Sequence, residues 1–551
     1  MKLSLRSAVG LLAAPLPILA LAVASPAHAA TPAPAALRGD VLPAIAHAHR
    51  GAQIDARQSI PVTLSLALRD QAGLTAFLQK VSDPHSAEYK HYLTVKQFAD
   101  RFGATAQSVR RVTDYLRSQG LAVGQLSANH LTLQARGTAA QVEKAFGTTL
   151  ATYHDASAKQ DFYANTSAPV LPASIAADVT DVAGLNDYAH YHSDLARNAS
   201  AQATSDATPM ATHPGLTPAH ARTAYNVASA ISSGYTGSGV TVGLLEFSAY
   251  SQSDVTTYDK GYSLTPPAPT VRTAGGGTTD TSGEDEVELD IEVVQALAPQ
   301  ASVKVYEAPN SDAGELAVYA ALVSDDVPVI STSWGEYEAG ETPSNLTAVN
   351  TDLQEASAQG QSFYAASGDS GSDDAGNGGT SVDFPASDPY VSGTGGTTLS
   401  LTSSGGWSKE TGWSGSGGGV SSEFATPSFQ SKVDTGSYRY VPDIAANADP
   451  SSGWSVYSEG AWDEYGGTSA AAPNWAAFTA IYDSEAKAKG KPAFGFANAT
   501  IYALAQSSNY SKAFHDVTSG SNGAYKAGTG YDRVTGWGTY NGANFLSAEL
   551  G

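Results

Sequence analysis

The sequence has 551 residues, which is too long for one ordinary hydrophobic core and predicts two or three domains. It contains no cysteine, which excludes disulfide bonds, thiol catalysis and metal sites with cysteine ligands. Most of the net charge of −23 lies in residues 201–551, which carry 39 acidic and 13 basic residues, so we expect no nucleic-acid partner and no binding to an anionic membrane. This charge suits a protein that works in acid, although a surface selected for solubility explains it equally well.

Residues 1–29 have the form of a signal peptide. Two basic residues precede an apolar run from Ala8 to Ala24, and residues 27–29 (Ala-His-Ala) have the small-x-small form of a cleavage site. A membrane anchor is the alternative, but two prolines interrupt a run that is already short for a membrane span. We therefore expect a secreted, extracellular protein.

The segment 30–189 alternates between strand and helix patterns. Apolar alternation and helical spacing predict strands at 59–68, 121–126, 130–136 and 149–154, and helices at 74–81, 95–102, 108–120 and 138–147. Mixed elements within roughly 100 residues predict a small α+β domain.

The stretch 190–215 is rich in serine, threonine and alanine and has few large apolar residues. This composition predicts an exposed linker between two domains. Because exposed linkers are open to proteolysis, we expect a maturation site there, within roughly residues 195 to 220.

Residues 216–551 begin with strands and helices in alternation. Strand-like runs at 240–247, 302–308, 327–335 and 362–367 alternate with helical runs at 287–298, 315–323 and 345–360. This order predicts an open, mostly parallel sheet with helices on both faces. Ligands of such sheets bind at the carboxyl ends of the strands, so we expect the functional site at the turns that follow residues 247, 334 and 367.

An acid-rich helix is predicted within residues 281–299. Glu286 and Asp290 are four residues apart and therefore share one face of it. Two carboxyl groups on a partly apolar face could share protons, which suits acid–base chemistry. Acidic residues also collect at helix N-termini because they favour the helix dipole, and Glu288 with Glu292 has the same spacing, so spacing alone leaves the role open.

The stretch "GGTSAAAP" at 466–473 places Ser469 where a glycine-rich turn leads into an alanine-rich helix. Glycines allow a sharp turn, the helix start directs N–H groups toward a reacting centre, and alanines let a substrate approach. A nucleophilic serine needs a base, yet the only histidine after residue 221 is His515, so a capped helix is an equal alternative. Asp369, between Gly368 and Ser370, could reach into the same cleft or be an ordinary turn residue.

Together, "GGTSAAAPNWAA", "GEDEVELD" and "SGDSG" resemble the sedolisins, also called serine-carboxyl peptidases, which include the kumamolisins. The resemblance covers most of residues 60–551. It implies a subtilisin-like α/β fold, with a mostly parallel sheet and helices on both faces, after a small α+β ferredoxin-like prodomain. It also implies an acid-acting serine-type endopeptidase that cleaves polypeptides and is made as a self-processing precursor.

The resemblance assigns a role to each of four residues. Ser469 is implied as the nucleophile, Glu286 as its general base, Asp290 as the carboxyl that shares a proton with Glu286, and Asp369 as the acid of the oxyanion hole. A carboxylate can activate a serine if its pKa lies near the working pH, and Asp369 must be protonated to donate a hydrogen bond to a developing oxyanion. We therefore expect activity in acid.

Three further residues match supporting positions of the family. Glu246 and Trp334 correspond to residues that hold the carboxyl pair by hydrogen bonds, and Asp383 corresponds to a residue that lines the substrate cleft in some members. Without the resemblance, Glu246 would be read as a strand-end acid and Trp334 as a core aromatic residue.

The stretch "FHDVTSGSNGAYKAGTGYDRVTGWG" resembles the calcium site of the family and implies one Ca²⁺ ion. Asp516 and Asp532 would supply carboxylates, while Val517, Gly528 and Gly530 would supply backbone carbonyls. Oxygen ligands suit a hard cation, and a pair of glycine-rich turns is the alternative. His515 would then lie beside this site rather than in the catalytic centre.

The predicted organisation is a signal peptide (1–29), a propeptide domain (30–189), a linker with the maturation site (190–215) and a catalytic domain with the calcium site (216–551). The propeptide would act as an intramolecular chaperone and inhibitor of a monomeric enzyme. Its near-neutral charge beside an acidic catalytic domain suggests a contact that acid weakens by removing attraction to its basic residues.

Three other functions compete with this interpretation. An ordinary subtilase needs a histidine on its catalytic helix, and residues 222–514 contain none. A zinc peptidase is disfavoured because no H-E-x-x-H motif occurs. A catalytically inactive secreted binding protein on the same fold remains the alternative, although all four candidate catalytic residues are present.

Overall fold

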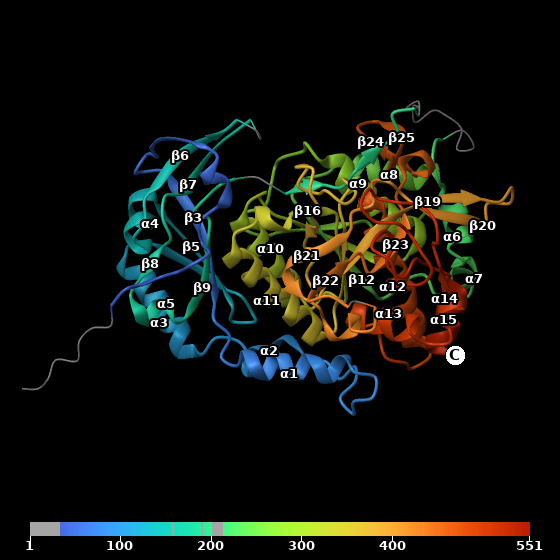
Figure 1. Ribbon diagram of the computed structural model, residues 1–551, viewed down its shortest axis with the longest axis horizontal. Helices are drawn as coiled ribbons and strands as arrows, with labels where there is room; N and C mark the ends of the chain where they lie inside the picture. The colour runs from blue at the N-terminus through green and yellow to red at the C-terminus, as the bar shows by residue number, and fades with distance from the viewer. Residues whose placement is uncertain (1–32, 157–158, 189–190, 201–212, 434) are drawn as a thin grey trace, which may run out of the picture.

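The computed structural model describes residues 33–156, 159–188, 191–200, 213–433 and 435–551 (Figure 1). The predicted signal peptide and linker residues 201–212 lie outside the described residues. Within the described ranges, no helix is both long and apolar enough to cross a lipid bilayer.

The N-terminal domain is built on a four-stranded antiparallel sheet in the order β4-β5-β3-β9. Helices α3 and α4 connect its strands as β-α-β-β-α-β, which is the ferredoxin-like arrangement. Thr105 and Thr138 cap the two helices, and Gly147 ends the second in a left-handed conformation. The elements are β3 (Ser59–Leu66), α3 (Ala106–Ser118), β4 (Ala122–Leu126), β5 (Thr132–Thr138), α4 (Ala139–Phe146) and β9 (Val179–Ala183).

The predicted strand at 149–154 forms but belongs to a second sheet, β2-β6-β7. Strand β9, which the sequence patterns did not predict, completes the main sheet instead. The remaining elements of this domain are β1 (Ala35–Ala36), β2 (His49–Gln53), α1 (Gln71–Ser82), α2 (Val95–Arg101), β6 (Leu150–Asp155), β7 (Gln160–Asn165), β8 (Val170–Leu171) and α5 (Ala173–Ala176).

The C-terminal domain has a central sheet in the order β13-β14-β12-β15-β17-β19-β20, with β23 also paired to β19. Every pairing is parallel except that of β19 with β20, as expected for alternating strands and helices. The strands are β12 (Thr241–Glu246), β13 (Thr270–Thr273), β14 (Ser302–Glu307), β15 (Val329–Thr332), β17 (Ser362–Ala366), β19 (Ser392–Leu401), β20 (Trp407–Gly412) and β23 (Ile444–Asn447).

Helices cover both faces of this sheet, in agreement with the prediction. Helices α9 (Glu284–Leu297) and α12 (Thr468–Ala488) pack on one face, and α10 (Asp312–Ser324) and α11 (Pro343–Gln359) pack on the other. The N-terminal domain lies against the outer side of α10 and α11, so these two helices separate its sheet from the central sheet (Figure 1).

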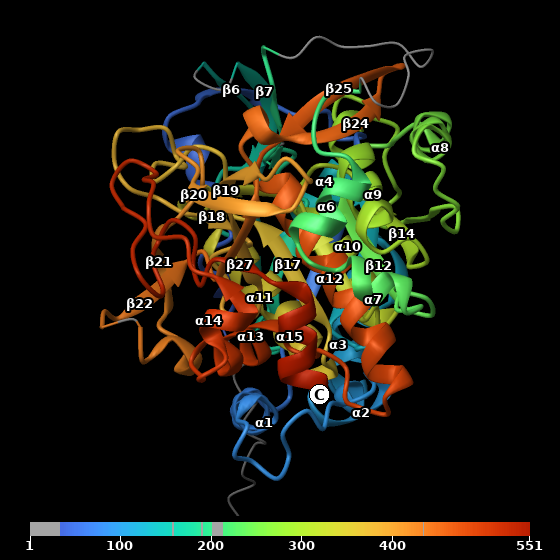
Figure 2. The ribbon, with the colours of Figure 1, turned by 90° about the vertical axis from the view of Figure 1, so that its right-hand side faces the viewer.

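Figure 2 shows the C-terminal helices on the side of the molecule away from the N-terminal domain. Smaller elements surround the core of the C-terminal domain. These elements are α6 (Pro218–Ala224), α7 (Ala228–Ser232), α8 (Gln252–Gly261), β16 (Trp334–Tyr337), β18 (Asp383–Phe384), β21 (Gly419–Ala425), β22 (Tyr438–Val441), β24 (Trp454–Ser458), β25 (Ala461–Gly466), α13 (Ala497–Ala505), α14 (Tyr510–Ala513), β26 (Phe514–His515), β27 (Thr539–Tyr540) and α15 (Gly542–Leu550).

The two domains meet through hydrogen bonds and apolar packing. The amide of Asn129 donates to Glu355 (2.6 Å), the amide of Asn186 donates to Asp312 (2.9 Å), and Lys90 donates to the carbonyl of Ala493 (3.2 Å). Among the residues that the structure describes, no ion pair within 4.0 Å joins the two domains. Lys90 is nevertheless attracted by the charges of Asp483 and Glu549 across the interface, and the expected weakening of the contact by acid stays a prediction.

The first part of the predicted linker pairs with the C-terminal domain, although His192 and Arg197 are exposed. Residues His192–Ser193 form β10, which pairs antiparallel with β16, and residues Ala196–Arg197 form β11, which pairs antiparallel with β25. Asp194, between the two strands, is 1% exposed. Serine and alanine content indicated a loop here, but the backbone hydrogen bonds of neighbouring strands hold the segment in place.

Candidate active site

Ser469 lies at the start of α12, in the turn that the sequence singled out. Gly467 precedes the helix with φ +97°, a left-handed conformation that favours glycine. Ser469 is fully buried, and its hydroxyl donates to Oε2 of Glu286 at 2.8 Å. The missing histidine is thus replaced, at hydrogen-bond distance, by a carboxyl group 183 residues earlier in the chain.

Glu286 and Asp290 project from α9 as predicted, and both are fully buried. Asp290 accepts from the hydroxyl of Ser333 at 2.8 and 3.0 Å, and its carboxyl hydrogen-bonds that of Glu246. The Trp334 indole donates to Glu246 at 2.7 Å. Asp290 therefore bonds directly to Glu246, a residue that the sequence offered only as support, while it acts on Glu286 through its charge.

Burial raises the pKa of each of these three carboxyl groups well above its usual value. The charge of Asp290 raises the pKa of Glu286 further, whereas the hydrogen bond from Ser469 lowers it. The Trp334 indole likewise lowers the pKa of Glu246 by donating to its ionised form. Close, buried carboxyls of this kind lose their protons one after another, so a single negative charge is shared by the cluster over a range of pH.

Asp369 occupies the turn after β17, at the carboxyl edge of the sheet where it was expected. Its Oδ1 accepts from the backbone N–H of Thr468 (2.7 Å) and from the hydroxyl of Thr468 (2.9 Å). Its Oδ2 is buried and has no hydrogen-bond partner among the described residues. Burial, and then the charge of Asp194, raise the pKa of Asp369 well above its usual value, which favours a protonated Oδ2.

The backbone of Asp194 runs through this centre. The N–H of Ser469 donates to the carbonyl oxygen of Asp194 at 3.1 Å, and the N–H of Asp194 donates to the carbonyl of Ser333 at 3.1 Å. A Cβ atom built on Gly467 would lie 2.0 Å from that Asp194 oxygen and 2.7 Å from Oδ2 of Asp369. Glycine therefore leaves the space in which a peptide carbonyl meets the N–H of Ser469 beside the Asp369 carboxyl.

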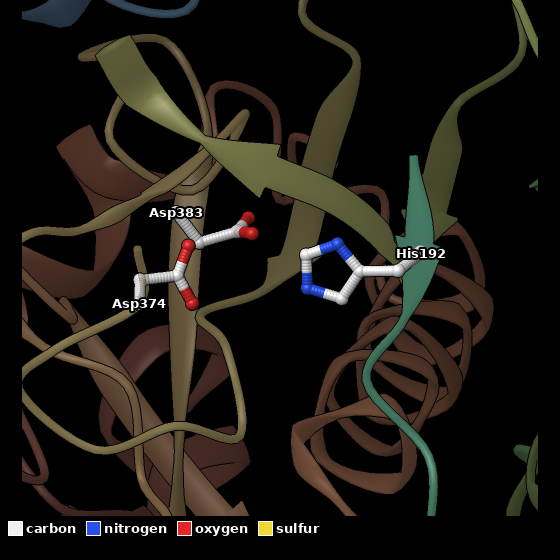
Figure 3. A group of neighbouring side chains, drawn as sticks. All are labelled: His192, Asp374 and Asp383. Carbon is white, nitrogen blue, oxygen red and sulfur yellow. The ribbon is translucent and has the colours of Figure 1, made fainter. Parts of the chain in front are cut away.

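Asp383 is fully buried at the edge of the same cleft. Figure 3 shows the ring of His192, on β10, directed toward the carboxyl groups of Asp374 and Asp383, and ligand atoms of the three residues lie within 4.8 Å of one another. The four carboxyl oxygens of Asp374 and Asp383 have no hydrogen-bond partner in the described part of the chain. Asp374 was not predicted, because nothing distinguishes it within the glycine-rich stretch "SGSDDAGNGG".

The candidate calcium residues come together in one loop region. Asp516 accepts from the N–H of Gly530 at 3.1 and 3.2 Å, and Asp532 accepts from the N–H of Gly528 at 2.9 Å. Val517, next to Asp516, is buried. Burial, followed by the charges of both aspartates, raises the pKa of Tyr510, so both carboxyl groups lie near this phenol.

His515 takes no part in the catalytic arrangement. Its ring stacks on Trp407 with centroids 4.0 Å apart, and burial lowers its pKa to about 4. It is therefore a neutral, packed side chain above that pH.

Comparison with known proteins agrees with this geometry. Residues 46–188 match the family described as pro-kumamolisin, activation domain, and residues 271–538 match the subtilase family. Kumamolisin from Bacillus sp. (strain MN-32) is 33% identical over 531 residues, which cover 90% of this chain and 92% of kumamolisin. The chain belongs to the sedolisin family of serine-carboxyl peptidases.

Two further relatives support the assignment of this sedolisin-family peptidase. Sedolisin from Pseudomonas sp. (strain 101) is 32% identical over 544 residues, covering 91% of this chain and 90% of its own length. The solved structure described as Pseudomonas sedolisin (serine-carboxyl proteinase) complexed with two molecules of pseudo-iodotyrostatin superposes with a TM-score of 0.55 at 32% identity. It covers 61% of this chain and 98% of its own. The predicted family, the subtilisin-like fold and the N-terminal activation domain are thereby confirmed.

Proposed function

We propose that this peptidase cleaves polypeptides in acid through an acyl-enzyme on Ser469, with Glu286 as the general base. The observation that carries the proposal is the 2.8 Å hydrogen bond from the Ser469 hydroxyl to Glu286, which joins a nucleophile to a buried base.

In the acylation step, Ser469 Oγ attacks the carbonyl carbon of the substrate while Glu286 accepts the hydroxyl proton. The C–N bond then breaks, and Glu286 returns the proton to the departing amine. A water molecule attacks the resulting ester with the same base, releasing the acid product and Ser469. Asp290, Glu246 and Trp334 position Glu286 and hold the proton that the carboxyl cluster keeps.

The negative charge that develops on the carbonyl oxygen needs donors in a dry site. The backbone N–H of Ser469 is one donor, since it already meets a carbonyl oxygen at 3.1 Å. Protonated Asp369 is the second, because Oδ1 is occupied by Thr468 and Oδ2 remains for the oxyanion. Ionised Asp369 would repel the oxyanion.

Two titrations then set the working pH. Activity falls at low pH when the carboxyl cluster around Glu286 is fully protonated and the base is lost. Activity falls again as pH rises, when Asp369 loses its proton. Because the pKa of Asp369 is raised, this loss of activity occurs at a higher pH than an ordinary aspartate would give.

The decisive experiment compares purified precursor with its Ser469→Ala and Ser484→Ala variants in acid. Ser484 lies on the same helix and serves as the matched control. We expect the wild-type and Ser484→Ala chains to convert to a shorter form and to hydrolyse an unfolded protein, and the Ser469→Ala chain to do neither. Equal processing of all three would remove Ser469 from the mechanism, and an activity maximum near neutrality would contradict the carboxyl mechanism. A fully inactive wild-type chain would favour the alternative of a binding protein.

The proposal includes secretion after removal of residues 1–29, a monomeric state and inhibition by the enzyme's own propeptide. It also includes one structural Ca²⁺ ion. The loop fits this ion, because Asp516 and Asp532 converge there and flexible glycine backbone can turn carbonyls inward at 528 and 530. The ion would crosslink two turns of the loop and has no part in the acyl transfer.

A further inference from the structure

We propose that the first bond this precursor cuts is its own Asp194–Leu195 bond, and that the pocket holding the Asp194 side chain selects acidic residues on the amino side of the cleaved bond. The inference rests on the proposed function and names the substrate of the same site. The cut lies at the start of the range, roughly residues 195 to 220, in which the sequence predicted the maturation site.

The backbone contacts fix which bond lies at the centre. On the amino side, β10 pairs with β16, with His192 opposite Gly335. On the carboxyl side, β11 pairs with β25, with Ala196 opposite Gly466, and the N–H of Asn198 donates to the carbonyl of Glu464 at 2.9 Å. An extended segment that adds a strand to both rims of a cleft is bound as a peptide substrate would be.

Between the two strands, the Asp194 carbonyl is the one that meets the catalytic groups. Its oxygen accepts from the N–H of Ser469 and lies beside Oδ2 of Asp369, a buried oxygen without another partner among the described residues. This is the position that an oxyanion would occupy. Attack by Ser469 Oγ at the Asp194 carbonyl carbon would break the C–N bond to Leu195, whose amine would take the proton that Glu286 accepted. Hydrolysis of the ester would leave a prodomain ending at Asp194 and a catalytic chain beginning at Leu195.

The Asp194 side chain enters a pocket rich in carboxyl groups. The backbone N–H of Asp369 hydrogen-bonds its carboxyl, and the His192 ring lies 3.7 Å away. The titratable groups that face it are His192, Glu286, Glu336, Asp369, Asp374 and Asp383. Only one of these groups can carry positive charge, so an ionised Asp194 meets mainly repulsion, whereas a protonated one can exchange hydrogen bonds with the partnerless oxygens of Asp374 and Asp383.

Binding of the Asp194 side chain in this pocket is therefore favoured by acid. Burial and the charge of Asp374 raise the pKa of Asp194, and burial raises the pKa of Asp374 to about 6. Below that pH Asp374 is largely protonated, so its repulsion of Asp194 falls and Asp194 is accepted as a hydrogen-bonding side chain. A lysine would have to bury its charge beside a carboxyl group whose protonation has removed its attraction.

The first test follows conversion of the wild-type precursor in acid by N-terminal sequencing and intact mass. Asp206, the other aspartate of residues 190–215, provides the matched control. We expect Leu195 as the earliest new N-terminus in the wild type and in Asp206→Ala. We expect Asp194→Ala to slow its appearance at least about ten-fold, and Asp194→Glu to process faster than Asp194→Ala. Incubation of Ser469→Ala alongside measures cleavage of the bond by acid alone.

A second test uses the matured enzyme and synthetic peptides that copy residues 190–199 with Asp, Glu, Asn, Leu or Lys at the position of Asp194. We expect Asp and Glu peptides to have the highest kcat/KM in acid, and the preference over Leu to shrink as pH rises above about 6. Cleavage elsewhere in the peptides, preference for Lys, or an earliest N-terminus other than Leu195 would overturn this inference while leaving the proposed function intact. Failure to cleave any peptide or protein would overturn the proposed function itself.

Discussion

The hydrogen bond from Trp334 to Glu246 allows a direct test of whether the buried carboxyls work as one unit. Replacing Trp334 with phenylalanine removes the indole N–H, which lies 2.7 Å from Oε2 of Glu246, and keeps an aromatic ring against Phe247. Glu246 is fully buried and hydrogen-bonds Asp290, so no solvent replaces the lost donor. Glu246 should then hold its proton to higher pH.

The size of the effect follows from the strength of the bond. A hydrogen bond to a charged group stabilises it by about 1.5–3 kcal/mol, and one pKa unit corresponds to about 1.4 kcal/mol. The variant should therefore move the acid limb of the kcat/KM profile upward by about one to two pH units. The alkaline limb should stay in place, because it belongs to Asp369, whose partners are Thr468 and the substrate carbonyl.

The assay is hydrolysis of one peptide substrate across the acid range, with unfolding measured in parallel. Trp407→Phe is the matched control, because its indole donates to Glu410 at 2.9 Å away from the site, and it should leave both limbs unchanged. An unshifted acid limb in Trp334→Phe, with activity retained, would refute the view that Glu246 shares a proton with the catalytic pair. Equal shifts in both variants would show a general loss of packing instead.

Three further outcomes are expected. Arg439→Met should lower the free energy of unfolding in urea by about 3–5 kcal/mol, because it leaves a fully buried carboxylate without its ion-pair partner, whereas exposed Lys409→Met should change it by less than about 0.5 kcal/mol. Burial raises the pKa of Asp352 to about 8, so its contribution to stability is complete in strong acid and is lost as pH rises toward that value. Asp352→Asn should therefore increase the free energy of unfolding of the precursor by about 2–4 kcal/mol near pH 8 but not near pH 3. The exposed control Asp114→Asn should change it at neither pH. Chelation of Ca²⁺ with EGTA at neutral pH should lower the Tm of the wild type but not that of Asp532→Asn, and an equal Tm with and without EGTA in the wild type would exclude the calcium site.

Local patterns were enough to predict the sheet and the edge that carries the site. Strands β12, β15 and β17 are short apolar runs bounded by turn residues, and parallel strands necessarily end at one edge. Strand β19 was not predicted, because its sequence "SGTGGTTLSL" has glycines and threonines where a strand pattern would show large apolar residues. Its stability comes from pairing with three neighbouring strands, which no local pattern records.

The acid helix shows a similar limit. Spacing placed Glu286 and Asp290 on one face, and the structure confirms this geometry. The second pair, Glu288 and Glu292, is equally buried, yet its carboxylates accept from the backbone N–H groups of Ser251 and Tyr457 and thus hold neighbouring loops. Two pairs with the same spacing differ only in what the fold brings against them, so sequence spacing alone could not separate them.

Composition predicted an exposed linker, and His192 and Arg197 are exposed, but it did not indicate that this segment pairs with β16 and β25 and buries Asp194. Peptide binding of this kind depends on backbone hydrogen bonds along two strand edges, which any sequence can make. Asp374 was missed for a related reason, because its position becomes informative only when the His192 strand lies beside it.

The space beside Gly467 has a consequence for other chains with this fold. A Cβ atom at this position would lie 2.0 Å from the carbonyl oxygen at the catalytic centre and 2.7 Å from Oδ2 of Asp369, so it would block the oxyanion position while Ser469, Glu286 and Asp369 all remain in the sequence. One substitution there could therefore produce a pseudoenzyme whose catalytic residues are all intact. Inspection of residue 467 separates such a chain from a working peptidase where a search for the catalytic residues alone would not.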